Sequence, residues 1–322
     1  MKQWLRIVSL VLALALVAPA ALAQADKPVI GILQFVQHAA LDAAREGFIA
    51  GLEAEGFRDG ENVIIVYENG QASQDINASI ADRFIADGVD LVLAIATPSV
   101  LAVAGKTETI PILGTAVTDY VSARLVQSNE APGFNVSGTT DMNPVADQIA
   151  LAKRMVPDMK TLGLLYTSSE VNSQTQAAMA KEEAAKLGLE VVERTINSSA
   201  DVQQAAIDIL GQVDVLYLPT DNIVASAIAL ISEQALAAGV PLAVGEEGMV
   251  RGGGTFTLGI NYFNLGEQTG RMAARILRGE AKVGEMPIES QTEFNYLVNK
   301  TFADAIGLEI PEDLLAFAEE IQ

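Results

Sequence analysis

Short polar stretches follow the apolar runs of this chain, and they hold most of the side chains that could bind a ligand. In "YLPTDNIV" (217–224) an apolar run ends at Thr220, Asp221 and Asn222 before a new apolar stretch begins. An aspartate at such a junction can cap a helix, or it can bind a cationic group. Five further apolar runs end in the same way, so the two roles have to be weighed for the whole set.

One of these junctions suits a negatively charged group and two suit a positively charged one. Thr97 and Ser99 stand at an expected helix start, where hydroxyls and free backbone N–H groups bind carboxylates. Asp221 and Glu246 offer negative charge to an ammonium group, and the helix dipole is expected to keep Asp221 ionised. Together they would hold the two ends of an amino acid. The other polar candidates at the junctions are His38, Thr118, Asp119, Ser168, Ser169, Asn172 and Asn222. Helix capping alone stays open as the role of each.

Sequence signatures of enzymes are missing. The chain has one histidine, His38, and no cysteine, which excludes a His-rich or Cys-rich metal site. The patterns GxSxG, GxxxxGK[ST] and a strand-linked GxGxxG do not occur. Glu246 and Glu247 are adjacent, and neighbours on an extended chain point in opposite directions. We therefore predict a binding protein without catalytic residues, cofactor or metal.

Apolar strands and amphipathic helices alternate along the chain in two similar halves. In the first half we expect strands at 28–35, 62–68, 89–96 and 110–117, with helices at 41–57, 74–88 and 99–106. In the second half we expect strands at 161–167, 189–196, 213–220 and 240–245, with helices at 174–188, 199–211 and 226–239. Strands that are apolar on both sides favour a parallel sheet covered by helices. The pattern predicts an α/β protein with two doubly wound lobes.

The remaining segments have to return to lobes that are already built. A helix at 267–279, a strand within 282–299 and a closing helix in "PEDLLAFAEEIQ" (311–322) follow the second half. We therefore predict one lobe from 27–138 plus 261–283 and the other from 139–260 plus 284–322. Several crossings between lobes form a hinge.

The N-terminus has the features of a secretory signal. Lys2 and Arg6 precede an apolar run at 7–17, which is too short to span a bilayer, and Ala21–Ala23 fits a signal-peptidase site. We predict a cleaved signal peptide at 1–23 and, since there is no cysteine, no lipid anchor. The chain carries 41 acidic against 20 basic residues, a formal charge of −21, which disfavours nucleic acid and anionic membranes as partners.

Several segments at strand ends resemble one known family. They include "AIATPS" (94–99), "NVSGTTDMNP" (135–144), "YLPTDN" (217–222) and "GEEGMVRGG" (245–253). The chain is similar to ABC-transporter substrate-binding proteins of the type I periplasmic binding fold, and within them to the tryptophan/tyrosine transport binding proteins. The resemblance implies an aromatic amino acid held between the lobes and an ABC permease as partner. It points to Phe35, then Tyr262, as the residue that stacks on the ring, with core or hinge packing as the alternative for each.

The sequence thus predicts a monomeric periplasmic protein that binds an amino acid. Two alternatives stay open and two others are disfavoured. The same fold could bind another small solute, such as a branched amino acid or an aromatic acid, or it could report a ligand to a membrane receptor. A secreted hydrolase is disfavoured by the missing motifs, and a transcriptional regulator by the signal peptide in place of a DNA-binding segment.

Overall fold

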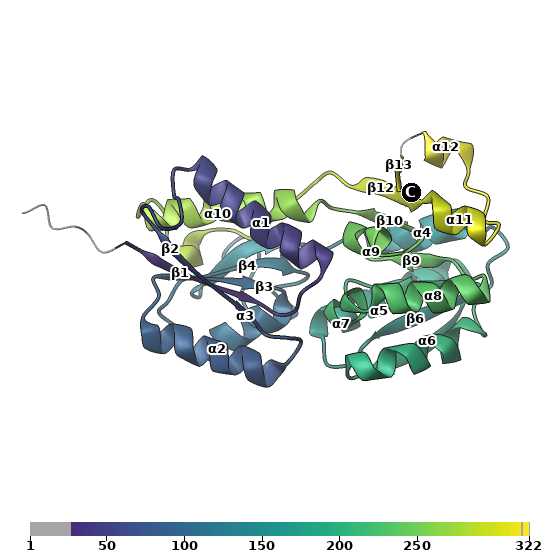
Figure 1. The fold of residues 1–322 in the computed structure, drawn as a ribbon, viewed down its shortest axis with the longest axis horizontal. Helices are drawn as coiled ribbons and strands as arrows, with labels where there is room; N and C mark the ends of the chain where they lie inside the picture. The colour runs from purple at the N-terminus through teal and green to yellow at the C-terminus, as the bar shows by residue number, and fades with distance from the viewer. Residues whose placement is uncertain (1–26, 317, 322) are drawn as a thin grey trace, which may run out of the picture.

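Two α/β lobes lie side by side in the computed structural model, which describes residues 27–316 and 318–321 (Figure 1). This confirms the predicted fold class of two lobes with mostly parallel sheets. The predicted signal peptide at 1–23 lies outside the described residues. None of the helices in the described ranges combines the length and the hydropathy that a membrane crossing requires.

The first lobe is built on a parallel sheet of six strands in the order β11-β5-β4-β3-β1-β2. Its strands are β1 (Val29–Gln34), β2 (Ile64–Asn69), β3 (Leu91–Ile95), β4 (Ile112–Val117), β5 (Val136–Thr140) and β11 (Glu289–Ser290). Its helices are α1 (Ala39–Ala54), α2 (Gln74–Asp87), α3 (Thr97–Ala104) and α10 (Tyr262–Leu277), with a short η2 (Val283–Glu285).

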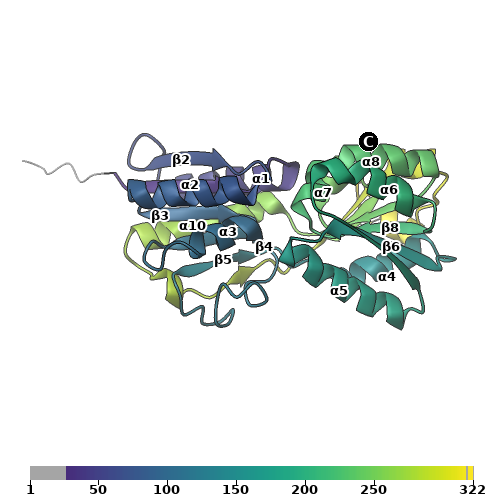
Figure 2. The same cartoon turned by 90° about the horizontal axis from the view of Figure 1, so that it is seen from below.

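Helices cover both faces of the first sheet, as its strands require. Successive side chains of a strand point to opposite faces. Leu91, Leu93 and Ile95 of β3 accordingly pack with α1 and α10, while Val92 and Ala94 pack with α2 and α3 on the other side. Seen from below, α2 and α3 lie in front of this sheet (Figure 2). The continuous apolar run of this strand is therefore explained by burial on two faces.

The second lobe has a seven-stranded sheet in the order β13-β12-β10-β9-β8-β6-β7, in which only the β10–β12 pair is antiparallel. Its strands are β6 (Thr161–Thr167), β7 (Glu190–Ile196), β8 (Val215–Leu218), β9 (Leu242–Val244), β10 (Phe256–Gly259), β12 (Asn295–Asn299) and β13 (Ala318–Ile321). Its helices are α4 (Val145–Met155), α5 (Val171–Lys186), α6 (Val202–Leu210), α7 (Asn222–Ser226), α8 (Ile228–Ala238), α9 (Glu247–Arg251), α11 (Lys300–Ala305) and α12 (Glu312–Leu315), with η1 (Ser199–Asp201).

Two expected helices take a different form. The predicted helix at 226–239 corresponds to α8. A separate short helix, α7, precedes it and begins at Asn222. The predicted closing helix is wrong over most of its length, because only Glu312–Leu315 is helical and Ala318–Ile321 forms β13. This last strand pairs in parallel with β12. The open edge of the sheet offers backbone partners that the helical spacing of 311–322 does not reveal.

The chain crosses between the lobes three times, at 141–144, 260–261 and 291–294. Side-chain amides join these crossings. The Asn143 Oδ1 atom accepts from the Ile260 N–H at 3.3 Å, and Gln291 both donates to the Asn261 carbonyl at 2.8 Å and accepts from the Asn261 N–H at 3.3 Å. The division into lobes at 138 and 283 stays a prediction; the first sheet itself keeps β5 up to Thr140 and gains β11 at Glu289–Ser290.

Four glycines allow α1 and α10 to lie in close contact. A Cβ atom on Gly47 would stand 1.9 Å from the Phe263 carbonyl oxygen, and one on Gly266 would stand 1.9 Å from that of Ala44. Gly51 and Gly270 face the opposite backbone in the same way. The helix that returns from the second lobe is thus seated on α1 at a distance that only glycine permits.

Replacing Gly266 with alanine should lower the free energy of unfolding by about 2 kcal/mol or more, because the added methyl group forces the two helix backbones apart. Urea unfolding followed by circular dichroism measures the change. Gly211→Ala is the matched control, since nothing lies within 4 Å of a Cβ there and the φ of Gly211 is −75°. Equal stability of the two variants would contradict the close contact.

Candidate functional site

An enclosed cavity lies where the carboxyl ends of the strands of both lobes meet. In this conformation the space open to the centre of a water-sized sphere is only about 10 Å³, so the lining side chains lie close together. It is lined by Leu41, Ala116, Thr118 and Tyr262 from the first lobe, by Asp141 from the first crossing, and by Asn172, Thr220, Asp221, Asn222, Ala225 and Glu246 from the second lobe. Ligands of open α/β sheets bind at this edge, so the cavity is the candidate binding site.

Six of the residues predicted from the sequence are brought together here. They are Thr118, Asn172, Asp221, Asn222, Glu246 and Tyr262. All six side chains are buried, although they come from segments up to 144 residues apart, between Thr118 and Tyr262. The rule that strand ends meet at one sheet edge accounts for this convergence. Their role in binding stays a prediction.

Three other predicted residues border the cavity rather than line it. His38 precedes α1 and approaches Asn222 across the cleft, with 3.5 Å between Nε2 and Oδ1. Thr97 and Ser169 line a neighbouring groove between α2, α3 and the start of α5. The Thr97 hydroxyl is buried without a hydrogen-bond partner, so it remains available to a ligand that extends from the cavity.

The last four predicted residues have other surroundings. Phe35 packs in the apolar core between the first sheet and α1, and Ser99 is buried and accepts from the Asn77 amide at 3.4 Å. The Asp119 carboxylate accepts from the N–H groups of Val121 and Ser122 at 3.0 Å and from the Ser122 hydroxyl. The Ser168 hydroxyl donates to Asn197 at 2.6 Å. Each of these side chains satisfies local structure outside the cavity.

Asp221 caps its helix and also joins two strand ends. Its carboxylate accepts from the Val224 N–H at 2.8 Å, which caps α7, and from the N–H and hydroxyl of Thr167 at 2.6 and 2.9 Å. Burial raises the pKa of Asp221 and so opposes the ionisation that the helix dipole alone predicted, while these hydrogen bonds lower it. Both carboxylate oxygens already accept hydrogen bonds, so Asp221 can act on a ligand through its charge but offers it no free acceptor.

Free acceptors come instead from Asp141 and Glu246. Asp141 accepts from the Tyr262 hydroxyl at 2.7 Å through Oδ2, while its buried Oδ1 has no partner. Glu246 accepts from the Gly248 N–H through Oε2, and its buried Oε1 has no partner either. Buried polar atoms are normally hydrogen-bonded, so two orphan carboxyl oxygens in one cavity indicate a site made for a donor.

Sequence reasoning missed Asp141, and it placed Glu170 at a polar strand end without assigning it a role. Asp141 follows "NVSGTT", a polar, glycine-containing stretch for which no strand was predicted and which forms the buried strand β5. Glu170 precedes α5 and is 2% exposed behind the cavity wall. The signal that could have found Asp141 is its place after a strand rich in β-branched residues, like that of Asp119.

Acidic side chains are concentrated around the cavity. Asp141, Glu170, Asp221 and Glu246 are all buried, and no Lys or Arg of the described chain is among the lining residues. Burial raises the pKa of Glu170 to about 8, helped by the charge of Asp221, and burial raises the pKa of Glu246 to about 8. Burial also lowers the pKa of His38 to about 4, which keeps this imidazole neutral. The lining residues therefore supply no cation of their own, and a cationic group of a ligand would complete the site.

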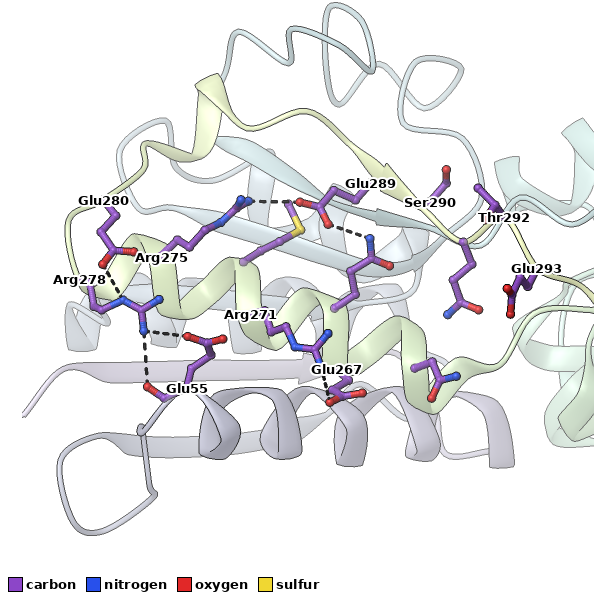
Figure 3. Close-up of a pocket in the computed structure, with 14 residues that line it drawn as sticks. Glu55, Glu267, Arg271, Arg275, Arg278, Glu280, Glu289, Ser290, Thr292 and Glu293 are labelled. Atoms are coloured by element: carbon purple, nitrogen blue, oxygen red, sulfur yellow. Dashed lines mark hydrogen bonds and ion pairs between the residues drawn. The ribbon is translucent and has the colours of Figure 1, made fainter.

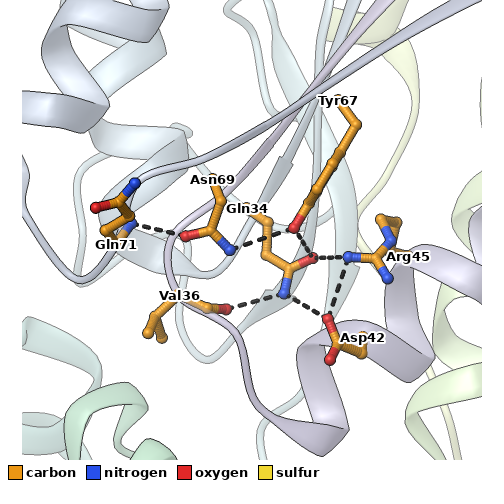
Figure 4. Close-up of polar contacts among 7 residues, drawn as sticks. All are labelled: Gln34, Val36, Asp42, Arg45, Tyr67, Asn69 and Gln71. Carbon is orange, nitrogen blue, oxygen red and sulfur yellow. Dashed lines mark hydrogen bonds and ion pairs between the residues drawn. The ribbon is translucent and has the colours of Figure 1, made fainter.

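A polar network positions the start of α1 at the cleft (Figure 4). The side chain of Gln34, at the end of β1, donates to the Val36 carbonyl and to Asp42, both at 2.9 Å. Arg45 donates to Gln34 at 2.8 Å and to Asp42 at 3.1 Å, and its guanidinium lies over the Tyr67 ring at 4.6 Å. These contacts fix the turn that carries His38 and Leu41 to the cavity.

A second hollow lies on the outer side of the first lobe, between α10 and residues 289–293 (Figure 3). Its three arginines are all paired with glutamates: Arg271 with Glu267 at 2.6 Å, Arg275 with Glu289 at 3.2 Å, and Arg278 with Glu55 and Glu280 at 3.0 and 2.9 Å. It is larger than the cavity but lies away from the strand ends, and partly exposed ion pairs of this kind suit a solvated surface.

The buried carboxyl groups predict how stability depends on pH. A carboxyl whose pKa is raised by folding binds a proton that the unfolded chain has lost, so its contribution is complete below about pH 4.5 and disappears as the pH rises through about 8. The free energy of unfolding of the ligand-free protein should therefore fall between pH 6.5 and 8.5, by up to about 1.4 kcal/mol per pH unit for each group. His38 adds little in this window, because its pKa of 6.5 in the unfolded chain and of about 4 in the folded protein both lie at or below the lower end of the window.

Glu246→Gln removes one of these groups and should make the fall shallower, while Glu61→Gln, on an exposed side chain, should leave it unchanged. Urea unfolding at four pH values measures the slope. A wild-type free energy of unfolding that rises over this window would contradict the raised pKa values.

Comparisons with known proteins agree with this arrangement. Residues 29–322 match the sequence profile of the family described as ABC transporter substrate binding protein. The chain is 40% identical over 280 residues to a tyrosine-binding protein of Clostridioides difficile. The aligned region covers 87% of this chain and 81% of that protein. Two more distant solute-binding proteins, at 13% and 16% identity, share the fold.

Two solved structures bear on how the lobes are arranged. An ABC domain from Streptococcus pneumonia in complex with L-Trp is 34% identical and has a TM-score of 0.89, with 92% of this chain and 100% of that chain covered. A ligand-free, open substrate-binding protein from Clostridium difficile is 43% identical, yet its TM-score is 0.69 over 92% of this chain and 99% of that one. The lobes here are thus arranged more like those of the complex than like those of the open structure. From the profile match and the 40% identity, the chain belongs to the ABC transporter substrate-binding protein family, with the type I periplasmic binding fold that its sequence predicted.

Proposed function

We propose that this protein binds a free aromatic amino acid between its lobes and delivers it to an ABC permease. The observation that carries the proposal is the closed cavity with buried carboxyl groups and no buried cation. An amino acid brings an ammonium group that would complete such a site. A relative named for tyrosine binding and a similar structure that contains L-Trp support the aromatic class.

The two ends of the ligand meet different groups. The free oxygens of Asp141 and Glu246 would accept hydrogen bonds from the ammonium group. The hydroxyls of Thr118 and Thr97 offer donors to the carboxylate, and Thr97 begins α3, whose N-terminus favours negative charge. Tyr262 lines the cavity and is the better candidate for contact with the ring, whereas Phe35 is fixed in the core.

The place of action follows from the family. Substrate-binding proteins of ABC importers work outside the cytoplasmic membrane. We propose that residues 1–23 direct export and are removed, that no lipid anchor follows, and that the mature protein acts as a monomer. The absence of catalytic activity belongs to the same proposal, because a binding protein has to release its ligand unchanged.

Isothermal titration of the mature chain with L-Trp, L-Tyr, L-Phe and L-Leu tests the proposal. At least one aromatic amino acid should bind with micromolar affinity or better, which corresponds to about 8 kcal/mol. Tyramine, which lacks the carboxylate, should bind more weakly than L-Tyr. Tighter binding of L-Leu than of all three aromatic amino acids would favour another solute, and equal binding of tyramine would remove the carboxylate role of Thr97 and Thr118.

Asp141→Asn tests the ammonium contact. The loss of one charged hydrogen bond should cost about 1.5–3 kcal/mol of binding, a 10- to 100-fold weaker affinity. Asp119→Asn is the matched control, because Asp119 follows the neighbouring strand β4 but its carboxylate is occupied by a surface turn. Calorimetry at constant pH compares the variants. Equal affinities for wild type and Asp141→Asn would exclude Asp141 from the site.

A further inference from the structure

Glu170 lies behind the cavity wall and collects four hydrogen bonds from the second lobe. Its Oε2 atom accepts from the side-chain amides of Asn172, at 2.9 Å, and Asn222, and from the Asn222 N–H at 3.3 Å. Its Oε1 atom accepts from the Ile223 N–H at 3.3 Å. Glu170 stands at the N-cap position of α5, but its side chain makes no capping bond to that helix. Its contacts are thus directed toward the site rather than toward its own helix.

These contacts decide which way two amides of the cavity point. All four partners are N–H groups, which only donate, so the oxygens of Glu170 accept from the NH₂ side of each amide whether or not the carboxyl group carries a proton. The Asn172 NH₂ group also donates to the Thr220 carbonyl at 3.0 Å, which leaves the Asn172 oxygen buried without a partner. The Asn222 oxygen is turned toward His38 of the other lobe. Both amides therefore present oxygen, and not nitrogen, on the side away from Glu170.

The unpartnered side-chain atoms of the cavity are thereby mostly acceptors. Buried side-chain oxygens without a partner occur on Asp141, Asn172, Thr220 and Glu246, all of which line it. A primary ammonium group has three donors and no acceptor, so it fits such a set. A hydroxyl has a single donor and would leave the remaining oxygens unpaired, which is costly in a buried site.

We propose that Glu170 is a positioning residue that makes the cavity selective for a primary ammonium group, by holding Asn172 and Asn222 with their oxygens inward. This inference rests on the proposed function, since it assumes that the ligand occupies this cavity. It adds a residue that does not line the cavity and a reason for its selectivity. A glutamine in this place keeps one oxygen instead of two, so its NH₂ group meets either the Ile223 N–H or the amides of Asn172 and Asn222, and it cannot accept from all four donors.

The test compares an aromatic amino acid with its α-hydroxy acid, in which a hydroxyl replaces the ammonium group. The pair is L-Tyr with 4-hydroxyphenyllactate or L-Trp with indole-3-lactate, whichever amino acid binds more tightly. The wild type should prefer the amino acid, and Glu170→Gln should reduce this ratio of affinities at least tenfold. Glu193→Gln is the matched control, because Glu193 accepts from Tyr166 and Lys181 on β7, away from the cavity; its ratio should match that of the wild type within twofold.

The ratio separates positioning from plain stability. If Glu170→Gln weakens both ligands by the same factor, or neither, Glu170 does not set selectivity and the inference is overturned. Thermal unfolding of each variant is measured first. Should Glu170→Gln fail to fold, Asn172→Ala removes the inward oxygen directly, and an unchanged ratio in that variant overturns the inference equally. Failure of the wild type to bind either amino acid would instead contradict the proposed function.

Discussion

Negative charge buried between the two lobes without a balancing cation is the constraint on which the rest of the structure depends. Asp141, Glu170, Asp221 and Glu246 are each 1–2% exposed. A buried carboxylate is costly unless it is paired, hydrogen-bonded or protonated. The protein meets this cost with backbone N–H groups, side-chain amides and raised pKa values, and it leaves a small number of oxygens for a ligand to satisfy. Closure and binding are therefore parts of one electrostatic problem.

The position of the site explains how a small ligand can bias a movement of whole lobes. Asp141 belongs to the first crossing and Tyr262 begins the helix after the second, and the two are joined by a 2.7 Å hydrogen bond. Asn143 and Gln291 join the three crossings to one another. A ligand that contacts Asp141 on one side and Glu246 or Asn172 on the other has contacts to both the hinge and the second lobe. A differential affinity of this kind is what shifts an open form toward a closed one.

Much of the fold could be predicted because its signals are local. Strands such as Leu91–Ile95 are apolar on both faces, and the helices between them have regular spacing, so the two parallel sheets follow from the sequence. The rule that strand ends meet at one sheet edge also predicts that Asn172, Asp221 and Glu246 lie together. Phe35 also lies at the end of a strand, yet its side chain packs in the core. The sequence does not show on which side of the sheet this last side chain falls.

The parts that could not be predicted depend on contacts far apart in the chain. Glu170 and Asn222 are separated by 52 residues, and neither sequence segment predicts the hydrogen bonds between them. Asp141 follows a strand whose glycine and threonines resemble a linker. The C-terminal segment has helical spacing, but the free edge of β12 converts Ala318–Ile321 into a strand. In each case tertiary partners override the local pattern.

The close contact between α1 and α10 has a consequence for how the chain is made. During synthesis the first lobe emerges before the second, but the helix that covers α1 and one face of its sheet emerges only after residue 261. Until then Phe48, Leu52 and the glycine surface of α1 have no cover. Most of the second lobe has to be synthesised before the first lobe can close its core. The two lobes are therefore completed together and not in the order in which they are translated.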